Sequence, residues 1–414
     1  MTIPKTLWYI SKYFSPETPM TPGGRGWFLM RELATAGHLP VVITSDSNNL
    51  IEVPDLQTKV TIEEQDGVRL VWLKTLKYKV AKSPSRILSW FHFEWNLFWL
   101  DKKELPRPDA IVVSSLSLLT VLSGVYLKRK YACLLVFEVR DIWPLTITEE
   151  GGVSPKNPFV RFLAWVERLG YEKADVIIGT MPNLESHVRR VSCSTAPVYC
   201  IPMGIAPEQT GARQPLKANY IAHYLSSPGM KVVHAGTIGI TNALEVFFEA
   251  AEQLKDNPDI QFLLVGDGAL KEQYIQQYGS LPNVTFAPKV SKYQVQSVLE
   301  HCDVVYFSMF DSKVWDHGQS LNKVVDYMLS GKPVVASYSG HASMINEAQC
   351  GVFVPAGDAS ALVEELQKLV LLRPEQREAM GIRGREWLLK NRPYSRLAEE
   401  FADAVFGSEK SVEA

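Results

Sequence analysis

Short apolar runs alternate with helical patterns along almost the whole chain. The run Leu7–Ile10 predicts a strand, and a helix over about Gly26–Ala36 and a second strand at Val41–Thr44 follow it. Further strands are predicted in the first half at Val68–Leu73, Ala110–Val113, Leu134–Val139, Val176–Gly179 and Val198–Ile201. Strands that alternate with helices usually form a parallel sheet with helices on both faces. The first half therefore predicts a doubly wound α/β domain.

A second alternation of the same kind begins after a polar segment that is rich in Pro, Gly and Ser. Its strands are predicted at Lys231–Ala235, Gln261–Val265, Val284–Phe286, Val304–Phe307, Pro333–Ser337 and Gly351–Val354. We thus expect Rossmann-like domains over 1–205 and 231–392, a linker over 206–230, and a last helix with a tail over 393–414. Two such domains should leave a deep cleft at the carboxyl ends of their strands, where open α/β sheets bind ligands.

One stretch of the second half combines a helix start with charged side chains. Asn322 is expected to cap a helix that ends at Gly331-Lys332-Pro333. Lys323 adds a positive charge to the free N–H groups of the helix start, which suits a diphosphate. Asp326 lies one turn further on and could accept hydrogen bonds from sugar hydroxyls. The pattern favours a nucleotide sugar, and an ordinary capped helix is the alternative.

Two further loops follow strands of the first half. Gly23 and Gly24 stand at the entrance of the first helix and let a ligand approach the backbone closely, although the spacing is not a dinucleotide fingerprint. Arg140 and Asp141 follow the strand Leu134–Val139, at a sheet edge where catalytic groups collect. Asp141 could orient an acceptor hydroxyl or take its proton. A salt bridge to Arg140, or a cap for residues 142–144, is the structural alternative.

Composition narrows the class of protein. The 414 residues carry a net charge of -2, so the protein as a whole is not attracted to nucleic acid. We expect no nucleic acid as a partner. Five cysteines without a Cys-x-x-Cys pair argue against disulfides or zinc and fit a reducing cytosol. No Asp-x-Asp pair or close histidine pair is present, so we expect neither a metal nor another cofactor. No signal layout and no membrane-spanning apolar run is found.

A basic segment followed by aromatic residues suggests a membrane surface. Between Gly67 and Phe93 there are six basic residues and no acidic one, and a helix rich in Trp and Phe overlaps its end. Each basic residue near an anionic bilayer contributes on the order of 1 kcal/mol. The expected membrane or acceptor contacts are Lys77, Lys82, Arg86, Trp90 and Trp95. The alternative is a helical hairpin whose aromatic residues pack on the N-terminal domain, and both can hold on different faces.

Several strings occur in the order in which family-4 glycosyltransferases have them. They are Tyr13-Phe-Ser-Pro-Glu17, Gly23-Gly24, Gly236-Thr-Ile-Gly239, Leu264-Val-Gly-Asp-Gly268, Ser320–Val335 and Gly351–Asp358. The chain resembles this family over almost its whole length. Glu138–Pro144 and Ser320–Met328 look like the subgroup of N-acetyl-fucosamine and related amino-sugar transferases of bacterial surface-polysaccharide synthesis.

The resemblance implies a GT-B fold, with two Rossmann-like domains that face a deep cleft. It implies that the N-terminal domain binds the acceptor, that the C-terminal domain binds the nucleotide sugar, and that the last helix returns to the N-terminal domain. The donor-binding residues it implies are Gly23, Gly24, Gly236, Thr237, Gly266, Ser320, Asn322, Lys323 and Asp326. With Arg140 and Asp141 as the catalytic pair, the resemblance also implies retention of the anomeric configuration.

This chain departs from the family pattern at the donor site. Gly318 stands where the family usually has the first of two glutamates, and Thr237 and Asn242 stand where it commonly has basic residues. Lys323 and the helix start would then provide more of the contacts to the diphosphate, and Arg140 or Arg25 would contact it when the two domains close. Retention without a fixed nucleophile would proceed by front-face attack, with the departing phosphate accepting the proton.

The function expected from the sequence is a retaining, hexosyltransferase-type glycosyltransferase. Its donor would be a nucleotide-linked N-acetylated amino sugar or deoxysugar, with UDP favoured by the resemblance alone. Its acceptor would be a lipid-linked saccharide of O-antigen or capsule synthesis, reached from the cytoplasm at the inner face of the plasma membrane. A degenerate, non-catalytic GT-B scaffold is the alternative that Gly318, Thr237 and Asn242 support.

Overall fold

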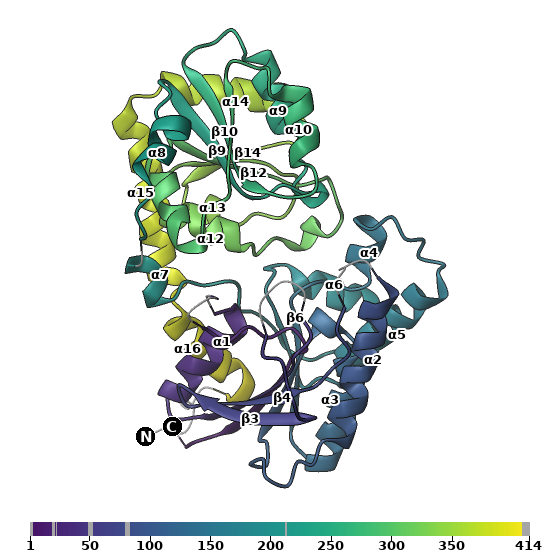
Figure 1. The fold of residues 1–414 in the computed structure, drawn as a ribbon. Coiled ribbons are helices and arrows are strands. Elements are labelled where there is room, and N and C mark those ends of the chain that lie inside the picture. Colours follow the sequence, from purple (N-terminus) through teal and green to yellow (C-terminus); the bar gives the residue numbers. More distant parts are fainter. Residues whose placement is uncertain are drawn as a thin grey trace, which may run out of the picture. The chain divides into compact units, whose positions relative to one another are not determined.

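The chain forms two compact units in a computed structural model, which describes residues 3–18, 21, 23–48, 53–78, 83–211 and 213–407. One unit consists of Met1–Pro202 together with Tyr394–Ala414, and the other of Met203–Pro393 (Figure 1). Each unit contains one sheet of mostly parallel strands with helices on both of its faces. The predicted α/β class with two Rossmann-like units is confirmed.

The first unit is built on an eight-stranded sheet with the order β3-β4-β2-β1-β5-β6-β7-β8. Its strands are β1 (Thr6–Ile10), β2 (Leu39–Ser45), β3 (Val60–Gln65), β4 (Val68–Leu73), β5 (Ala110–Ser114), β6 (Leu134–Val139), β7 (Val176–Gly179) and β8 (Val198–Cys200). All neighbours pair in parallel except β3, which runs antiparallel to β4 at the edge. Strand β3 was not predicted from the sequence, because this partly exposed edge strand carries polar residues and shows no apolar run.

Six main helices and the last helix of the chain cover this sheet. They are α1 (Arg25–Thr35), α2 (Pro84–Trp99), α3 (Thr120–Tyr131), α4 (Leu145–Glu149), α5 (Pro158–Lys173), α6 (Leu184–Val191) and α16 (Tyr394–Phe406). The C-terminal α16 packs against α1 near the start of the chain (Figure 1). The Phe28 and Tyr394 rings stack with their centroids 4.9 Å apart, so an aromatic contact holds the C-terminal helix on this unit.

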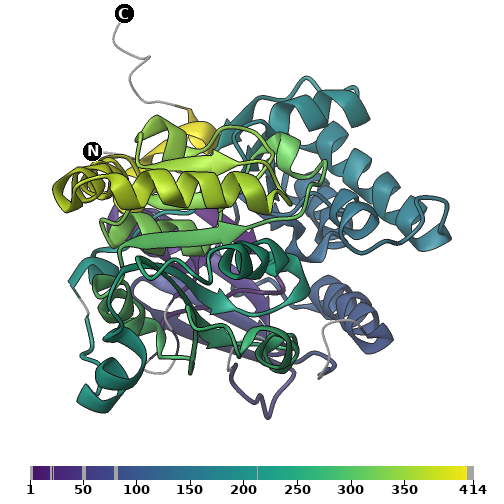
Figure 2. The same ribbon diagram turned by 90° about the horizontal axis from the view of Figure 1, so that it is seen from above.

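The second unit has a six-stranded parallel sheet with the order β11-β10-β9-β12-β13-β14. Its strands are β9 (Met230–Thr237), β10 (Ile260–Asp267), β11 (Val284–Ala287), β12 (Val304–Ser308), β13 (Val334–Ser337) and β14 (Gly351–Val354). Its longer helices are α9 (Glu245–Gln253), α10 (Lys271–Tyr278), α11 (Val295–Glu300), α12 (Asn322–Leu329), α14 (Ala359–Leu371) and α15 (Pro374–Asn391). Figure 2 shows the green strands of this unit beside its yellow-green helices.

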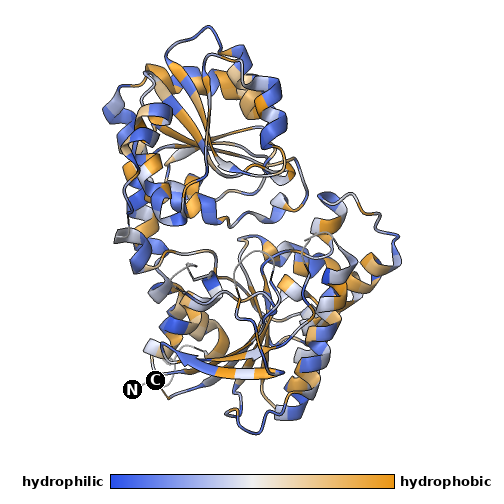
Figure 3. Ribbon diagram, in the orientation of Figure 1, coloured by the Kyte–Doolittle hydropathy of each residue, from blue (hydrophilic) through white to orange (hydrophobic). Residues whose placement is uncertain are grey.

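Neighbouring residues of each strand face opposite sides of this sheet and build two separate apolar layers. Val232 and Phe262 pack with residues of α9 and α14, whereas Val233 and Leu263 pack with residues of α11 and α12. Because both faces are covered, the strands are continuous hydrophobic runs, which appear orange in Figure 3. This explains why apolar runs alone predicted most of these strands.

The polar segment 206–230 belongs to the second unit and is not an isolated linker. It contains α7 (Pro207–Gly211), α8 (Ala218–Tyr220) and a π-helical turn over Ile221–Leu225. Leu225 is buried in the core layer that also contains Val233, and Ser297 Oγ donates a hydrogen bond to Gln214 O at 2.7 Å. Because its few apolar residues are separated by polar ones, the segment shows no periodicity that would have predicted its packing.

None of the helices in the described ranges combines the length and the hydrophobicity that a membrane crossing requires.

Candidate functional site

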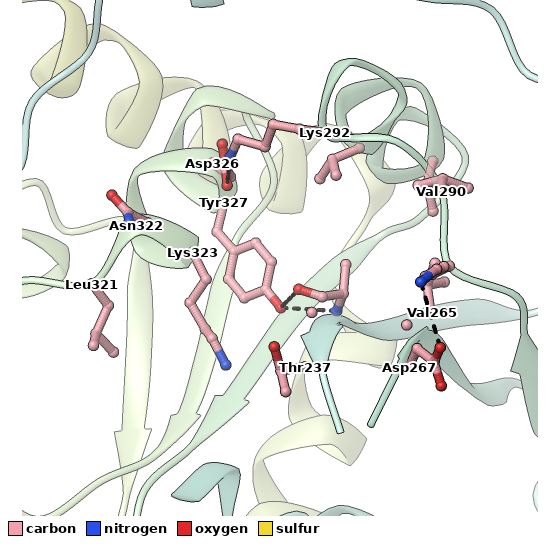
Figure 4. Close-up of a pocket in the computed structure, with 16 residues that line it drawn as sticks. Thr237, Val265, Asp267, Val290, Lys292, Leu321, Asn322, Lys323, Asp326 and Tyr327 are labelled. Carbon is pink, nitrogen blue, oxygen red and sulfur yellow. Dashed lines mark hydrogen bonds and ion pairs between the residues drawn. The ribbon is translucent and has the colours of Figure 1, made fainter. Parts of the chain in front are cut away.

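A cavity of about 610 Å³ opens in the second unit where β9 and β10 end (Figure 4). The start of α12 and the loop that follows β11 complete its wall. Its lining residues are Ala235, Gly236, Thr237, Val265, Gly266, Asp267, Lys289, Val290, Lys292, Val295, Val298, Leu321, Asn322, Lys323, Asp326 and Tyr327. The structure thus brings together six of the predicted donor residues: Gly236, Thr237, Gly266, Asn322, Lys323 and Asp326.

Two paired glycines form the end of the sheet in this cavity. Gly236 of β9 is opposite Gly266 of β10, and their φ angles are 156° and 155°. A Cβ atom on Gly266 would lie 1.8 Å from Gly236 O, so no larger residue fits there. The absence of side chains exposes the strand ends to the cavity, which lets a ligand approach the backbone.

Lys323 places a positive charge at the start of α12. Its Nζ donates a hydrogen bond to Asn242 Oδ1, and Figure 4 shows the amine pointing into the cavity beside Thr237. Desolvation lowers its pKa to about 8, and no carboxylate among the described residues opposes that shift. A cation that is partly desolvated and lacks an anionic partner gains most from a bound anion.

A buried histidine beneath this lysine stays neutral. His234 is fully buried, and desolvation together with the nearby charge of Lys323 lowers its pKa to about 3. Its Nε2 lies 3.4 Å from Thr237 O. The positive charge at this end of the cavity therefore belongs to Lys323 and not to His234.

Asp326 presents a carboxylate one turn further along α12. It forms an ion pair with Lys292, which follows β11, and Figure 4 shows the two side chains in contact at the cavity wall. Desolvation raises the pKa of Asp326, and Lys292 opposes the shift. Tyr327 accepts a hydrogen bond from Ala235 N at 3.0 Å and donates one to Ala235 O at 3.3 Å. The tyrosine therefore fixes α12 against β9, with both charges on the cavity side.

The predicted helix cap in this loop needs correction. Asn322 is the first residue of α12 and not its cap: Leu321 occupies the cap position, and no side chain caps the helix there. The polar side chain of Asn322 suggested a cap, which would place the first helical residue at Lys323. The helix begins one residue earlier, at Asn322 itself. Ser320 is not among the residues that line the cavity, and its Oγ accepts a hydrogen bond from Met203 N at 2.8 Å, so its contact with the donor stays a prediction.

Two basic residues of the cavity that follow β11 were not predicted from the sequence. Lys292 forms an ion pair with Asp326. Lys289 Nζ lies 3.6 Å from Asp267 Oδ2 at the opposite wall of the cavity. Both lysines follow the carboxyl end of a parallel strand, which is the signal that would have placed them near the other loops of this edge.

The predicted catalytic pair lies in the first unit, on a loop that is held by its backbone. Ser115 Oγ accepts hydrogen bonds from Arg140 N at 2.9 Å and from Asp141 N at 3.3 Å. Across the described ranges, Arg140 and Asp141 form no ion pair with each other, and Arg140 Nε is buried without a hydrogen-bond partner. Desolvation by the surrounding residues raises the pKa of Asp141, and the positive charge of Arg140 opposes this shift. The Asp141 residue is nevertheless exposed to solvent.

Arg86 and Trp90 of α2 lie close to this loop. Tyr13 Oη accepts hydrogen bonds from Trp90 Nε1 at 2.8 Å and from Arg86 Nε at 3.2 Å. The Trp90 ring meets the edge of Trp143, two residues after Asp141, at a centroid distance of 5.6 Å. Trp90 is only 2% exposed, so the prediction that it contacts a membrane is wrong. Its apolar ring completes the core of the unit instead.

The other predicted membrane contacts have different environments. Trp95 is 63% exposed and lies beside Trp99, at a centroid distance of 5.8 Å. Lys77 forms an ion pair of 2.9 Å with Asp46. Lys82 lies outside the described residues.

Arg25 cannot reach a diphosphate, contrary to the sequence-based hypothesis. Its side chain is fully buried, forms an ion pair of 2.5 Å with Glu138 and donates to Ile201 O at 2.7 Å. The neighbouring Gly23 and Gly24 precede α1 in the first unit and do not line the cavity of the second. A Cβ atom on Gly23 would lie 2.3 Å from the Trp27 ring, so close packing requires this glycine.

Comparisons with known proteins agree with the fold. The model of the glycosyl transferase 4-like domain matches residues 28–204, and that of the glycosyl transferases group 1 matches residues 229–371. No curated protein sequence matches the chain.

Solved structures share the whole architecture at low identity. Sucrose-phosphate synthase from Thermosynechococcus elongatus is 19% identical, with a TM-score of 0.70 over 96% of this chain and 98% of that chain. The E. coli trehalose-6-phosphate structure bound with UDP-2-fluoro glucose is 13% identical, with a TM-score of 0.71 over 97% and 98%. WaaG, a glycosyltransferase involved in lipopolysaccharide biosynthesis, is 15% identical, with a TM-score of 0.60 over 97% and 100%.

The fold and the two domain matches define a glycosyltransferase of the GT-B class. Its first unit carries the glycosyl transferase 4-like domain, and its second unit carries the group 1 domain, which contains the cavity.

Proposed function

We propose that the cavity of the second unit binds a UDP-linked sugar and that the protein transfers this sugar with retention of its anomeric configuration. Lys323 carries the proposal: it is a desolvated cation at a helix start, it has no anionic partner among the described residues, and it lies beside a glycine-lined strand end. A diphosphate supplies the missing negative charge, and the N–H groups of α12 add further donors.

The rest of the cavity suits the nucleoside. Asp326, held by Lys292, presents carboxylate oxygens that can accept hydrogen bonds from the ribose hydroxyls. Val265, Val290 and Val295 line the wall on the other side and offer apolar contacts to a planar base. The choice of uridine is supported by the E. coli relative of the same fold, which was solved with UDP-2-fluoro glucose.

The transfer itself needs orientation more than a covalent nucleophile. The acceptor oxygen attacks the anomeric carbon on the face from which the diphosphate departs, and its proton passes to a phosphate oxygen as the glycosidic bond forms. We assign the positioning of the acceptor hydroxyl to Asp141, because its backbone is fixed by Ser115 while its carboxylate remains exposed. Arg140 lies beside it, and its positive charge can stabilise the departing phosphate.

We propose a lipid-linked saccharide as the acceptor, reached by peripheral binding to an anionic membrane from the cytoplasmic side. The support is an apolar stripe on the exposed face of α2, which consists of Leu88, Phe91, Trp95, Phe98 and Trp99. Each of these side chains is at least 48% exposed. Their spacing of three or four residues places them on one side of a helix that is too short to cross a bilayer. An N-acetylated amino sugar or deoxysugar in O-antigen or capsule synthesis is the donor and pathway that we propose.

We propose further that transfer needs no metal ion. The support is Lys323, which can supply to the diphosphate the positive charge that a divalent cation would otherwise provide. Activity should then persist in EDTA, and a loss of activity that Mg²⁺ restores would contradict this part of the proposal.

The first test is thermal stabilisation by UDP, GDP, ADP and dTDP in the presence of EDTA. We expect a selective rise in melting temperature with UDP, because a ligand that binds only the folded state stabilises it. The Lys323→Ala variant should show a much smaller rise, and Lys255→Ala, which removes an exposed charge from the same unit outside the cavity, serves as the control. If no nucleotide stabilises the protein, the proposal that it is a glycosyltransferase enzyme fails. The hypothesis of a non-catalytic GT-B scaffold then explains the fold better.

A further inference from the structure

The segment that follows β11 forms one wall of the cavity in the second unit. We call it the wall loop; it consists of residues 288–294 and ends in a 3₁₀ turn. It contributes Lys289, Val290 and Lys292 to the lining. Figure 4 shows Val290 and Lys292 on this wall, with Lys292 beside Asp326 of α12. The position of the wall loop therefore decides where the apolar wall lies and where the cation that holds Asp326 lies.

The start of the wall loop is held by Tyr220 of α8. Tyr220 Oη donates a hydrogen bond to Pro288 O at 2.8 Å. Desolvation raises the pKa of Tyr220 to about 12, so the hydroxyl stays protonated and can donate at neutral pH. The rings of Tyr220 and Tyr224 lie 5.0 Å apart and pack against the core layer that contains Val233. The donor of this hydrogen bond is thus fixed by packing.

The end of the wall loop is held by the residues that precede α8. Gln214 N donates to Tyr293 O at 3.0 Å, and Gln294 Nε2 donates to Pro215 O at 3.1 Å. Gln214 is itself fixed, because its carbonyl oxygen accepts a hydrogen bond from the buried Ser297 Oγ of α11 at 2.7 Å. We call residues 214–220 the supporting segment, since they are hydrogen-bonded to both ends of the wall loop.

The supporting segment can act on a ligand only through the wall loop. Neither Tyr220 nor Ser297 lines the cavity. Figure 4 shows Lys323 away from Val290, on the other side of the cavity. A loop that is fixed before a ligand binds does not have to be ordered during binding, so less affinity is lost. This gain applies to the part of a ligand that contacts the wall loop and not to a group that Lys323 holds.

We propose that the supporting segment positions the wall loop, and that Tyr220 and Ser297 are positioning residues for the nucleoside part of the donor. The role for the nucleoside rests on the proposed function of the cavity. The support of the wall loop rests on the hydrogen bonds alone and can be tested without a nucleotide.

Calorimetric titration of the whole protein with UDP and with inorganic pyrophosphate tests the effect on the ligand. In Tyr220→Phe/Ser297→Ala, the dissociation constant of UDP should rise about fivefold or more, while that of pyrophosphate should stay within about twofold of wild type. Tyr220→Phe alone should show a smaller change in the same direction. Tyr224→Phe is the matched control, because it removes a neighbouring hydroxyl that forms no hydrogen bond in the described ranges. Unchanged UDP affinity in the double variant, or an equal loss for pyrophosphate, would overturn the role for the nucleoside.

Hydrogen exchange of the ligand-free protein tests the support itself. The amides of Gln214 and Gln294 donate to Tyr293 O and Ser291 O, so they report on the attached end of the wall loop. We expect them to exchange about threefold faster or more in the double variant than in wild type and Tyr224→Phe, with no change in β12. Equal exchange in all three proteins would overturn the support. If no nucleotide binds to wild type, the proposed function of the cavity fails, whereas the exchange rates still decide whether the supporting segment holds the wall loop.

Discussion

Lys323 Nζ is held by Asn242 Oδ1, an amide oxygen, and not by a carboxylate. An amide fixes the position of the ammonium without neutralising its charge. Because desolvation has lowered the pKa of this lysine to about 8, the charge is present at neutral pH and is lost in mildly alkaline solution. The cavity is therefore prepared for an anion within a limited pH range.

We predict that nucleotide affinity falls as the pH rises through about 8. The charged form of Lys323 exists below this pH and disappears above it, and a bound diphosphate favours the charged form. One proton is linked to binding, so the dissociation constant of UDP should rise by up to about tenfold between pH 8 and pH 9. Calorimetric titration at several pH values measures this change directly.

The Lys323→Gln variant is the control for this pH dependence. It should bind UDP about tenfold or more weakly at pH 7, since a charge-assisted contact is lost, and it should lose most of the pH dependence. Lys323→Ala should likewise raise the donor KM or lower kcat at least tenfold. Near-wild-type binding and kinetics in both variants would remove Lys323 from the donor site.

Gly266→Ala should destabilise the second unit. The new Cβ would lie 1.8 Å from Gly236 O, and the φ of 155° is unfavourable for alanine. We expect a loss of about 3 kcal/mol or more, because backbone strain and a clash with a backbone atom add together. Gly239→Ala is the matched control, since the nearest atom to its Cβ lies at 3.7 Å. Thermal unfolding of the two variants should differ clearly, and equal melting temperatures would contradict the close approach of the strands.

Arg25→Met should destabilise the first unit without affecting the nucleotide. The substitution leaves the buried Glu138 without its cation, which typically costs about 3–5 kcal/mol. The double variant Arg25→Met/Glu138→Leu should recover part of this loss, because no unpaired buried charge remains. Thermal unfolding measures both effects. UDP affinity of the folded variant should match wild type within about twofold, and a larger loss would restore the hypothesis that Arg25 contacts the diphosphate.

The exposed tryptophans of α2 should control membrane binding. The double variant Trp95→Ser/Trp99→Ser removes two side chains that are 63% and 65% exposed, so it should reduce flotation with anionic vesicles by about tenfold or more with little change in stability. Trp165→Ser, which removes a tryptophan that is 53% exposed on α5, is the control. Flotation that does not depend on anionic lipid, or that both variants retain in full, would count against a membrane surface.

Sequence patterns predicted the architecture because the central strands of these sheets are buried on both faces. Phe262 to Val265 is a continuous apolar run, and Val232, Val233 and Ala235 form a second one that only His234 interrupts, so both predict parallel strands. The edge strand β3 and the segment 206–230 escaped prediction for the opposite reason. They are only partly buried, and their polar residues conceal the pattern.

The residues of the candidate site were predictable where they lie close together in the sequence. Lys323 and Asp326 share a helix start, so their spacing alone brought them to one cavity wall. Contacts between distant segments were not predictable in this way. Only the tertiary structure decided that Asn242 holds Lys323, that Lys292 pairs with Asp326, that Trp90 is buried while Trp95 is exposed, and that Arg25 neutralises Glu138 inside the core. Hydrophobic periodicity is a local property of the chain, whereas the partner of a charge depends on which strands become neighbours in the sheet.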